Sequence, residues 1–100
     1  MKKVLITPRS FGKYNREELI EKLLQHGIEP VFNPYGTIMN EQQMRSALQD
    51  MDGLIVGVDP VSEEALRQAP RLRAIAKYGV GIDNIACAYA QDRKSTRLNS

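Results

Sequence analysis

The sequence predicts an α/β domain built around a parallel β-sheet, and three observations support this prediction. Short apolar runs alternate with helix-like segments along the chain, which is the pattern of consecutive β-α units. Residues 54–58 (LIVGV) are almost continuously apolar, as expected for a strand that is covered on both faces. The 100 residues are 42% hydrophobic and 26% charged, which is typical of one ordinary globular domain.

The first β-α unit is expected near the amino terminus. Residues 4–6 (VLI) predict the first strand, and Asn15 is suited to cap the helix that follows, with Glu18 at the capping-box position. Gly27 is expected to end this helix, because glycine adopts the left-handed conformation common after a helix. The apolar face of the helix would comprise Leu19, Ile20, Leu23 and Leu24.

The following elements repeat this pattern. Residues 30–32 (PVF) predict a short second strand, and the proline favours a position at the sheet edge. Asn40 is expected to cap a second helix with Gln43 at the box position, and Ser62 a third helix that ends before Pro70. The inner faces of the two helices would comprise Met44, Ala47, Leu48 and Met51 in the second and Ala65, Leu66 and Ala69 in the third.

The strand order follows from composition and handedness. Residues 74–76 (AIA) are the fourth predicted strand. Right-handed crossovers, with the apolar first and third strands at the centre, predict a flavodoxin-like sheet of order 2-1-3-4 with flanking helices. Half of a Rossmann fold, with order 3-2-1-4, is the alternative, but it would place the proline-containing strand inside the sheet. We expect the domain to be incomplete, with an edge of the fourth strand unpaired.

Residues 92–100 (DRKSTRLNS) are expected to be a disordered, non-native tail. They show neither a helical nor a strand period, and they match the translation of a widely used DNA-sequencing adapter. A polar natural terminus is the alternative. Arg93, Lys94 and Arg97 against Asp92 account for the whole net charge of +2, and eleven basic and eleven acidic residues remain without the tail. This balance does not favour a nucleic-acid partner.

Other features of the sequence restrict the cellular compartment and the kinds of site that the chain could contain. The apolar run after Met1 is too short for a signal peptide or a membrane span. The single Cys87 excludes an internal disulfide and a cysteine-based zinc site, which favours the cytoplasm, and it is interpreted as a packed side chain. His26 lies at a helix end, where it complements the helix dipole, and no nearby acidic residue would make it a catalytic base. No metal site is predicted.

Candidate ligand contacts lie in the loops at the carboxyl ends of the predicted strands, because ligands of open α/β sheets bind there. These loops span residues 8–14, 59–61 and 78–84, and the first carries Arg9, Ser10, Gly12 and Lys13. In the third, Gly79 and Gly81 allow the backbone to direct amide groups at an anion. A glycine-rich turn that only leaves a strand explains the pattern equally well.

Two other ligand classes fit these loops less well. A dinucleotide site is not predicted at Gly79–Gly81, because the third glycine position holds Asn84 and an acidic ribose partner would fall beyond residue 100. Asp59 follows the third strand, where a receiver domain places its phosphorylated aspartate. The loop after the first strand lacks the acidic pair that receivers need, so Asp59 is interpreted as a turn residue.

Three segments carry a resemblance to a known family. Residues 7–12 (TPRSFG), 57–61 (GVDPV) and 69–85 (APRLRAIAKYGVGIDNI) resemble the amino-terminal part of D-2-hydroxyacid dehydrogenases, most closely the phosphoglycerate-dehydrogenase-like branch. The resemblance covers residues 2 to 91 by the order and spacing of the elements. One departure is Ala86, where family members usually have an acidic residue that caps the next helix, expected over residues 87–91.

The resemblance implies an NAD-dependent oxidoreductase of the cytoplasm that acts on a D-2-hydroxy acid, with 3-phosphoglycerate as one candidate, and forms a homodimer. Residues 1–91 would be the amino-terminal part of a substrate-binding domain that is split around an inserted Rossmann domain, which this chain lacks. The backbone of Gly79, Val80 and Gly81 would bind the substrate carboxylate, with Ser10 and Arg9 as further substrate contacts.

The same resemblance leaves the catalytic centre outside this chain. The family's catalytic Arg, Glu and His come from a later region, so no catalytic or cofactor-binding residue is assigned, and the chain alone is expected to be inactive and not to bind NAD. The alternatives from other classes are a receiver-like signalling module and a non-catalytic module that binds small anions.

Overall fold

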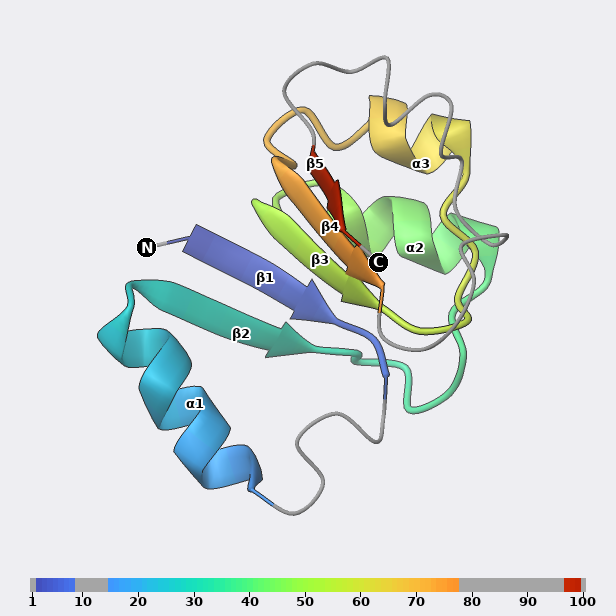
Figure 1. Ribbon diagram of the computed structural model, residues 1–100. Helices are drawn as coiled ribbons and strands as arrows, with labels where there is room; N and C mark the ends of the chain where they lie inside the picture. Colours follow the sequence, from blue (N-terminus) through green and yellow to red (C-terminus); the bar gives the residue numbers. More distant parts are fainter. Residues whose placement is uncertain (1, 9–14, 78–96, 100) are drawn as a thin grey trace.

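The computed structural model describes residues 2–8, 15–77 and 97–99. Five parallel strands in this part of the chain form one sheet of order β2-β1-β3-β4-β5 (Figure 1). The strands are β1 (Lys2–Ile6), β2 (Ile28–Phe32), β3 (Gly53–Val56), β4 (Ala74–Lys77) and β5 (Arg97–Asn99), and the helices are α1 (Arg16–Gln25), α2 (Glu41–Leu48) and α3 (Glu63–Arg67). The order of the first four strands confirms the flavodoxin-like prediction and excludes the Rossmann order.

The strand positions follow the apolar pattern of the sequence. β1 pairs with β2 on one side and with β3 on the other, so its apolar residues Leu5 and Ile6 are buried. β2 has a neighbour on one side only, and Pro30 lies opposite Val4. The edge position predicted from this proline is therefore confirmed, because an edge strand tolerates the missing amide donor.

The hydrophobic core lies on one face of the sheet. Helices α2 and α3 pack against each other on that face, whereas α1 lies beside β2, away from them (Figure 1). The crossovers from β1 to β2 and from β2 to β3 run in opposite directions, so right-handedness places α1 and α2 on opposite faces. The core cluster comprises Leu5, Met39, Met44, Leu48, Met51, Leu54, Val56, Val61, Ala65, Leu66, Ala69, Leu72 and Ile75.

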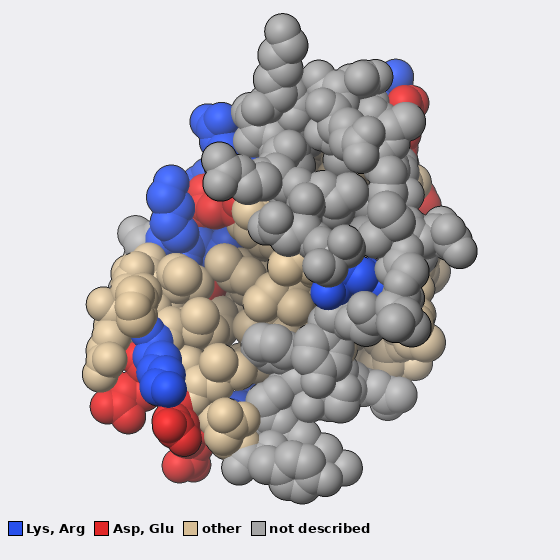
Figure 2. All heavy atoms as spheres, viewed as in Figure 1, with Lys and Arg blue, Asp and Glu red and all other residues tan. Residues whose placement is uncertain are grey.

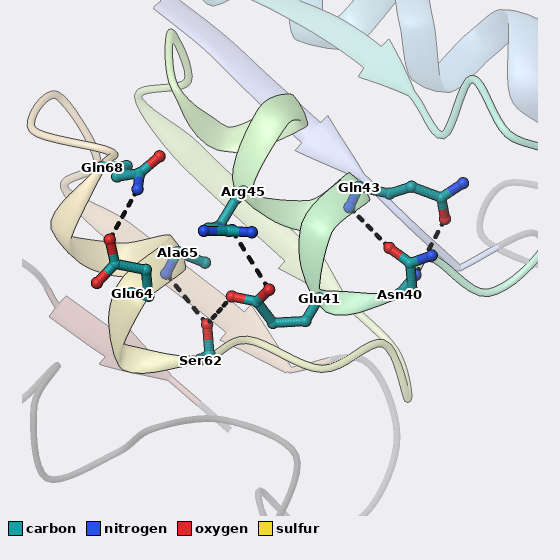
Figure 3. Close-up of polar contacts among 8 residues, drawn as sticks. All are labelled: Asn40, Glu41, Gln43, Arg45, Ser62, Glu64, Ala65 and Gln68. Atoms are coloured by element: carbon teal, nitrogen blue, oxygen red, sulfur yellow. Dashed lines mark hydrogen bonds and ion pairs between the residues drawn. The ribbon is translucent and has the colours of Figure 1, made fainter.

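The predicted caps of α2 and α3 are confirmed and are joined to each other (Figure 3). The backbone N–H of Gln43 donates to Asn40 Oδ1 at 2.8 Å, and the backbone N–H of Asn40 donates to Gln43 Oε1 at 3.0 Å. Ser62 Oγ accepts from the backbone N–H of Ala65 at 3.1 Å and donates to Glu41 Oε1 at 2.8 Å. The first turns of the two helices are thereby fixed together, which stabilises both amino ends.

Helix α1 differs from its prediction in two respects. Asn15 occupies the capping position, but its side chain makes no capping hydrogen bond, so the expected box with Glu18 is not formed. None of the α1 side chains is buried, and Leu24, expected on the inner face, is 45% exposed. The reason is that α1 packs mainly on the edge strand β2, where there is little sheet surface to cover. Gly27 ends the helix as predicted, with φ of 74°.

Strand β5 corrects the expectation that residues 92–100 contain no strand and that β4 has an unpaired edge. Arg97, Leu98 and Asn99 pair in parallel with Ala74, Ile75 and Ala76 of β4. Pairing at a sheet edge uses main-chain groups, which almost any residue supplies, and three residues are too few to show a period. The non-native origin of this segment stays a prediction, and the expected helix 87–91 lies outside the described residues.

The described surface carries no long stretch of one charge in the view of Figure 2, where acidic and basic side chains lie intermixed over α1. Lys22 and Glu18 form one such pair along the helix, with nitrogen and oxygen 3.7 Å apart. Among the described helices, none is long and apolar enough to cross a bilayer.

Candidate functional site

The candidate site lies at the carboxyl edge of the sheet, between the ends of β1 and β3. The chain leaves β1 toward α1 and β2 on one side, whereas β3 lies on the other side of β1 (Figure 1). This is the position at which the strand order reverses, and ligands of open α/β sheets bind there. The residues that leave the two strands at this switch point are Thr7 and Pro8 after β1 and Gly57, Val58 and Asp59 after β3.

Two buried polar side chains join the strands at the switch point. Thr7 is 3% exposed and Asp59 is 2% exposed. The Thr7 hydroxyl donates to Asp59 Oδ1 at 2.7 Å and accepts from the backbone N–H of Gly57 at 3.1 Å. The hydroxyl therefore acts as donor and acceptor at once, which fixes its orientation.

The second carboxylate oxygen of Asp59 reaches the loop between β2 and α2. Asp59 Oδ2 accepts from the backbone N–H of Met39 at 2.8 Å. We call Thr7, Met39, Gly57 and Asp59 the Thr7–Asp59 network. It connects the segments that follow β1, β2 and β3 through both oxygens of one carboxyl group.

The sequence pattern predicts only a turn at Asp59, and this network was not predicted. The signal was present, because Asp59 follows a continuously apolar strand and Thr7 directly follows the other central strand. Polar residues at the same edge of adjacent parallel strands are brought together by the sheet itself.

A second contact ties the end of β4 to the end of β3. The ammonium group of Lys77 donates to the backbone carbonyl of Gly57. A Cβ at position 57 would lie 3.4 Å from Cγ of Pro8, an ordinary van der Waals contact. The segments that follow β1 and β3 are therefore close neighbours at the switch point.

The predicted substrate-binding residues lie outside the described residues. These are Arg9, Ser10, Gly79, Val80 and Gly81. Five other residues considered above but not predicted to bind substrate also lie outside the described ranges: Gly12, Lys13, Asn84, Ala86 and Cys87. The structure does describe Pro8 and Lys77, from which the two predicted loops continue. Both residues follow or end strands at the carboxyl edge, on the two sides of β3.

Two aliphatic side chains are exposed in the loops of this edge, beside the exposed ring of Tyr35. Val58, between buried Gly57 and Asp59, is 65% exposed. Ile38, next to buried Met39, is 54% exposed. Each therefore precedes one partner of the hydrogen bond between Met39 and Asp59.

The described residues do not fit a dinucleotide or a metal ion. The described part of the turn after β1 is Thr7 and Pro8, with no glycine. The tight glycine turn that admits a pyrophosphate is therefore lacking in this part of the chain. No group of three or more His, Cys, Asp or Glu side chains in the described ranges is arranged to bind a metal.

Comparisons with known proteins agree with this architecture. Residues 4–99 match the sequence model of a family described as D-isomer specific 2-hydroxyacid dehydrogenase, catalytic domain. Glyoxylate/hydroxypyruvate reductase B of Serratia proteamaculans (strain 568) is 37% identical over 67 residues, which cover 67% of this chain and 20% of that protein. The family match extends into residues 92–99, the segment expected to be non-native.

Solved structures share the fold. The NAD+-bound 3-phosphoglycerate dehydrogenase of Entamoeba histolytica superposes with a TM-score of 0.77 at 24% identity, over 98% of this chain and 32% of that one. The TT0316 protein of Thermus thermophilus gives a TM-score of 0.76 at 24% identity, over 96% and 29% of the two chains. This chain thus spans between a fifth and a third of the length of these relatives. On the family match, the chain belongs to the D-isomer specific 2-hydroxyacid dehydrogenases and forms part of their catalytic domain.

Proposed function

We propose that this chain is the substrate-holding part of an oxidoreductase that transfers hydride between NAD(H) and a D-2-hydroxy acid or its 2-oxo acid. The observation that carries the proposal is the switch point between β1 and β3, fixed by the Thr7–Asp59 network in a chain of this family. A rigid edge at that place suits a site that must position a small acid against a cofactor held elsewhere.

The proposed carboxylate site is the backbone of Gly79, Val80 and Gly81, with Arg9 and Ser10 as further contacts. Lys77 supports this assignment, because its contact with the carbonyl of Gly57 fixes the chain two residues before Gly79. Amide N–H groups directed at a carboxylate make charge-assisted hydrogen bonds and need no side chain. Their role would be to bind and orient the acid, with the hydride supplied by the nicotinamide of another domain.

The wider assignments are part of the same proposal. We infer a Rossmann NAD domain in the remainder of the protein, a homodimeric assembly and a cytoplasmic location, the last on the single Cys87. Glyoxylate and hydroxypyruvate are candidate substrates by the Serratia relative, and 3-phosphoglycerate by the Entamoeba structure. The chain of 100 residues alone should not bind NADH in a calorimetric titration, and saturable one-to-one binding would contradict this.

The test of the carboxylate site is Gly81→Val in the full-length protein of the same gene. Removal of a pair of charge-assisted hydrogen bonds should lower kcat/KM for the 2-oxo acid by a factor of roughly 30 to 1,000 and raise KM. The affinity for NADH should stay nearly constant, because the cofactor would bind the other domain.

The kinetic constants must be corrected for the concentration of folded enzyme. If Gly81 serves only a turn, its replacement by valine would lower the stability of the protein and leave KM unchanged. A normal KM in properly folded Gly81→Val enzyme would rule out the carboxylate role. A full-length gene that encodes no NAD domain would favour a non-catalytic module that binds small anions.

A further inference from the structure

Two arginines at the amino edge of the sheet carry an inference that does not depend on the proposed function. We propose that Arg71 and Arg73 bind the phosphate group of a soluble small molecule, at the opposite end of the strands from the candidate functional site. Both arginines belong to the segment that leads from α3 into β4. In Figure 2, basic side chains gather around an acidic one over the region where β1, β3 and β4 begin in Figure 1.

The backbone that carries the two arginines is held in place. Leu72, which lies between them, is fully buried in the core, and its N–H donates to the carbonyl of Ala69 at 3.2 Å. The N–H of Arg73 donates to the carbonyl of Asp52 at 2.8 Å, which fixes the chain to the residue before β3. Arg71 and Arg73 are both exposed. Because the backbone is fixed, less conformational freedom is lost when the two side chains bind an anion.

The charges along the amino edge leave an excess of positive charge at its β4 end. One row of residues crosses four strands, because Glu29 pairs with Lys3 and main-chain hydrogen bonds join Lys3 to Asp52 and Asp52 to Arg73. Lys3 therefore lies between two carboxylates, whereas Arg73 ends the row at β4, and Arg71 adds a cation outside it. Glu29 is three strand spacings from Arg73, about 14 Å, so salt screens its charge there.

The ion pair between Arg71 and Asp52 leaves the arginine able to bind a better acceptor. One guanidinium nitrogen of Arg71 lies 3.4 Å from both Oδ1 and Oδ2 of Asp52, whereas charge-assisted hydrogen bonds are about 2.7–2.9 Å long. The Arg71 side chain is 57% exposed, and Asp52 already accepts from the N–H of Lys3 at 2.8 Å. Within the described ranges, the Arg73 guanidinium forms no hydrogen bond or ion pair. Both guanidinium groups therefore have donors available for a ligand.

A phosphate group suits this pair of arginines better than a carboxylate does. A phosphate monoester carries nearly two negative charges and three acceptor oxygens, so it can accept from both guanidinium groups and balance their charge. A carboxylate balances only one of them. An extended acidic peptide would need a longer basic surface, which Asp52 and the exposed Asp50 interrupt on the β3 side. The chemistry therefore favours a small phosphorylated ligand.

The test is a titration of the 100-residue chain with inorganic phosphate and with glycerol 3-phosphate, followed by the NMR signals of the backbone amides and the arginine side chains. Both ligands should shift the signals of Arg71 and Arg73, with a dissociation constant on the order of 1 mM at low ionic strength. Acetate at the same ionic strength should bind about tenfold more weakly. The double variant Arg71→Gln, Arg73→Gln should weaken phosphate binding by about tenfold or more. Arg71→Lys with Arg73→Lys should recover only part of the affinity, because lysine lacks the paired donors of a guanidinium group.

Two further variants separate a site from an effect of net charge. Arg45→Gln with Arg67→Gln removes the same charge from α2 and α3 and should change the dissociation constant by less than about twofold. Asp52→Asn removes the carboxylate that competes for Arg71 and should tighten phosphate binding by about threefold.

Three results would overturn the inference. They are an unchanged affinity in the Arg71→Gln, Arg73→Gln variant, an equal loss in the Arg45→Gln, Arg67→Gln variant, and an equal affinity for acetate. Phosphate that shifts only signals of the carboxyl edge would likewise place the anion elsewhere. Hydride transfer has no part in these measurements, so their outcome is independent of whether the proposed function is confirmed.

Discussion

The amino and carboxyl edges of the sheet each use one aspartate to join neighbouring strands, but the two aspartates do so differently. At the amino edge, Asp52 and Lys3 exchange hydrogen bonds, from the N–H of Asp52 to the Lys3 carbonyl at 2.8 Å and from the N–H of Lys3 to Asp52 Oδ2 at 2.8 Å. The carbonyl of Asp52 also accepts from the backbone N–H of Arg73 at 2.8 Å. At the carboxyl edge, Asp59 is buried and binds a hydroxyl and a loop amide.

The two aspartates have different structural roles. The amino edge repeats main-chain contacts of the sheet and adds an ion pair with the exposed Arg71, at 3.4 Å from Asp52 Oδ2. These contacts stabilise the strands. The carboxyl edge fixes loops that leave the sheet, through side-chain oxygens that require burial and well-placed partners. A buried network of this kind is costly to disrupt, and it orders the segments where a ligand would bind.

The largest effect is expected for Asp59→Ala. The variant leaves the Thr7 hydroxyl and the Met39 N–H without their acceptor in a buried region, which should lower the free energy of unfolding by about 3 kcal/mol. Urea denaturation of the 100-residue chain measures this change. Asp50→Ala, at an exposed position, is the matched control and should cost less than about 0.5 kcal/mol. Equal losses in the two variants would contradict a central role of the Thr7–Asp59 network.

A smaller effect is expected for Thr7→Val, which keeps the shape of the side chain and removes the hydroxyl. Asp59 would retain the N–H of Met39, but the N–H of Gly57 would lose its acceptor, at a cost of about 1.5 kcal/mol. Thr7→Ser keeps the hydroxyl and should recover most of the loss. Because the two residues share one hydrogen bond, the double variant with Asp59→Ala should lose less than the sum of the single losses. Additive losses would show that the two residues act independently.

At the amino edge, Asp52→Asn is expected to lower the free energy of unfolding by about 1 kcal/mol. The size of this loss depends on pH. The hydrogen bond from the Lys3 N–H lowers the pKa of the Asp52 carboxyl below its ordinary value; the charges of Arg71 and Lys2 act in the same direction, and burial opposes them. The folded state therefore binds this proton more weakly than the unfolded state. The stabilisation is complete above the ordinary pKa near 4 and is lost as the pH falls through the folded value.

Unfolding curves of wild type and Asp52→Asn from pH 6 to pH 2 test this prediction. The asparagine variant should be less stable at pH 6 and should lose less stability on acidification, so that the two curves converge. Asp50→Asn, which removes a carboxylate at an exposed position, is the control for the change in net charge alone. A constant gap between wild type and Asp52→Asn at all pH values would contradict the electrostatic contribution.

The parts of the fold that could be predicted are those that depend on residues close together in the sequence. Strand order, the caps at Asn40 and Ser62 and the inner faces of α2 and α3 follow from local patterns, because apolar periodicity and capping spacings act within a few residues. The failed cap at Asn15 and the exposure of Leu24 depend on where α1 packs, which no local pattern specifies.

From the sequence, the location of the candidate site could be predicted, but the contacts within it could not. The rule for open sheets gives the carboxyl edge, and the sequence offers Arg9, Ser10 and the glycines 79 and 81 there as candidates, none of which lies in the described residues. The Thr7–Asp59 network joins residues 52 positions apart in sequence. Such a pair becomes visible only when the strand order is known, because register and order decide which strand ends are neighbours.

The smallest effect is expected for deletion of residues 92–100, which removes β5 from the outer side of β4. The pairing of β5 involves three residues opposite Ala74, Ile75 and Ala76, and it touches neither Asp52 nor Asp59. An edge strand of this length should contribute less than about 0.5 kcal/mol, so the melting temperature should fall by less than roughly 3 °C. The losses caused by Asp59→Ala and Asp52→Asn should be the same with and without the tail, since distant changes add. A larger fall in melting temperature, or a changed loss for either aspartate variant, would show that residues 92–100 pack as a native part of the domain and would contradict their interpretation as a non-native tail.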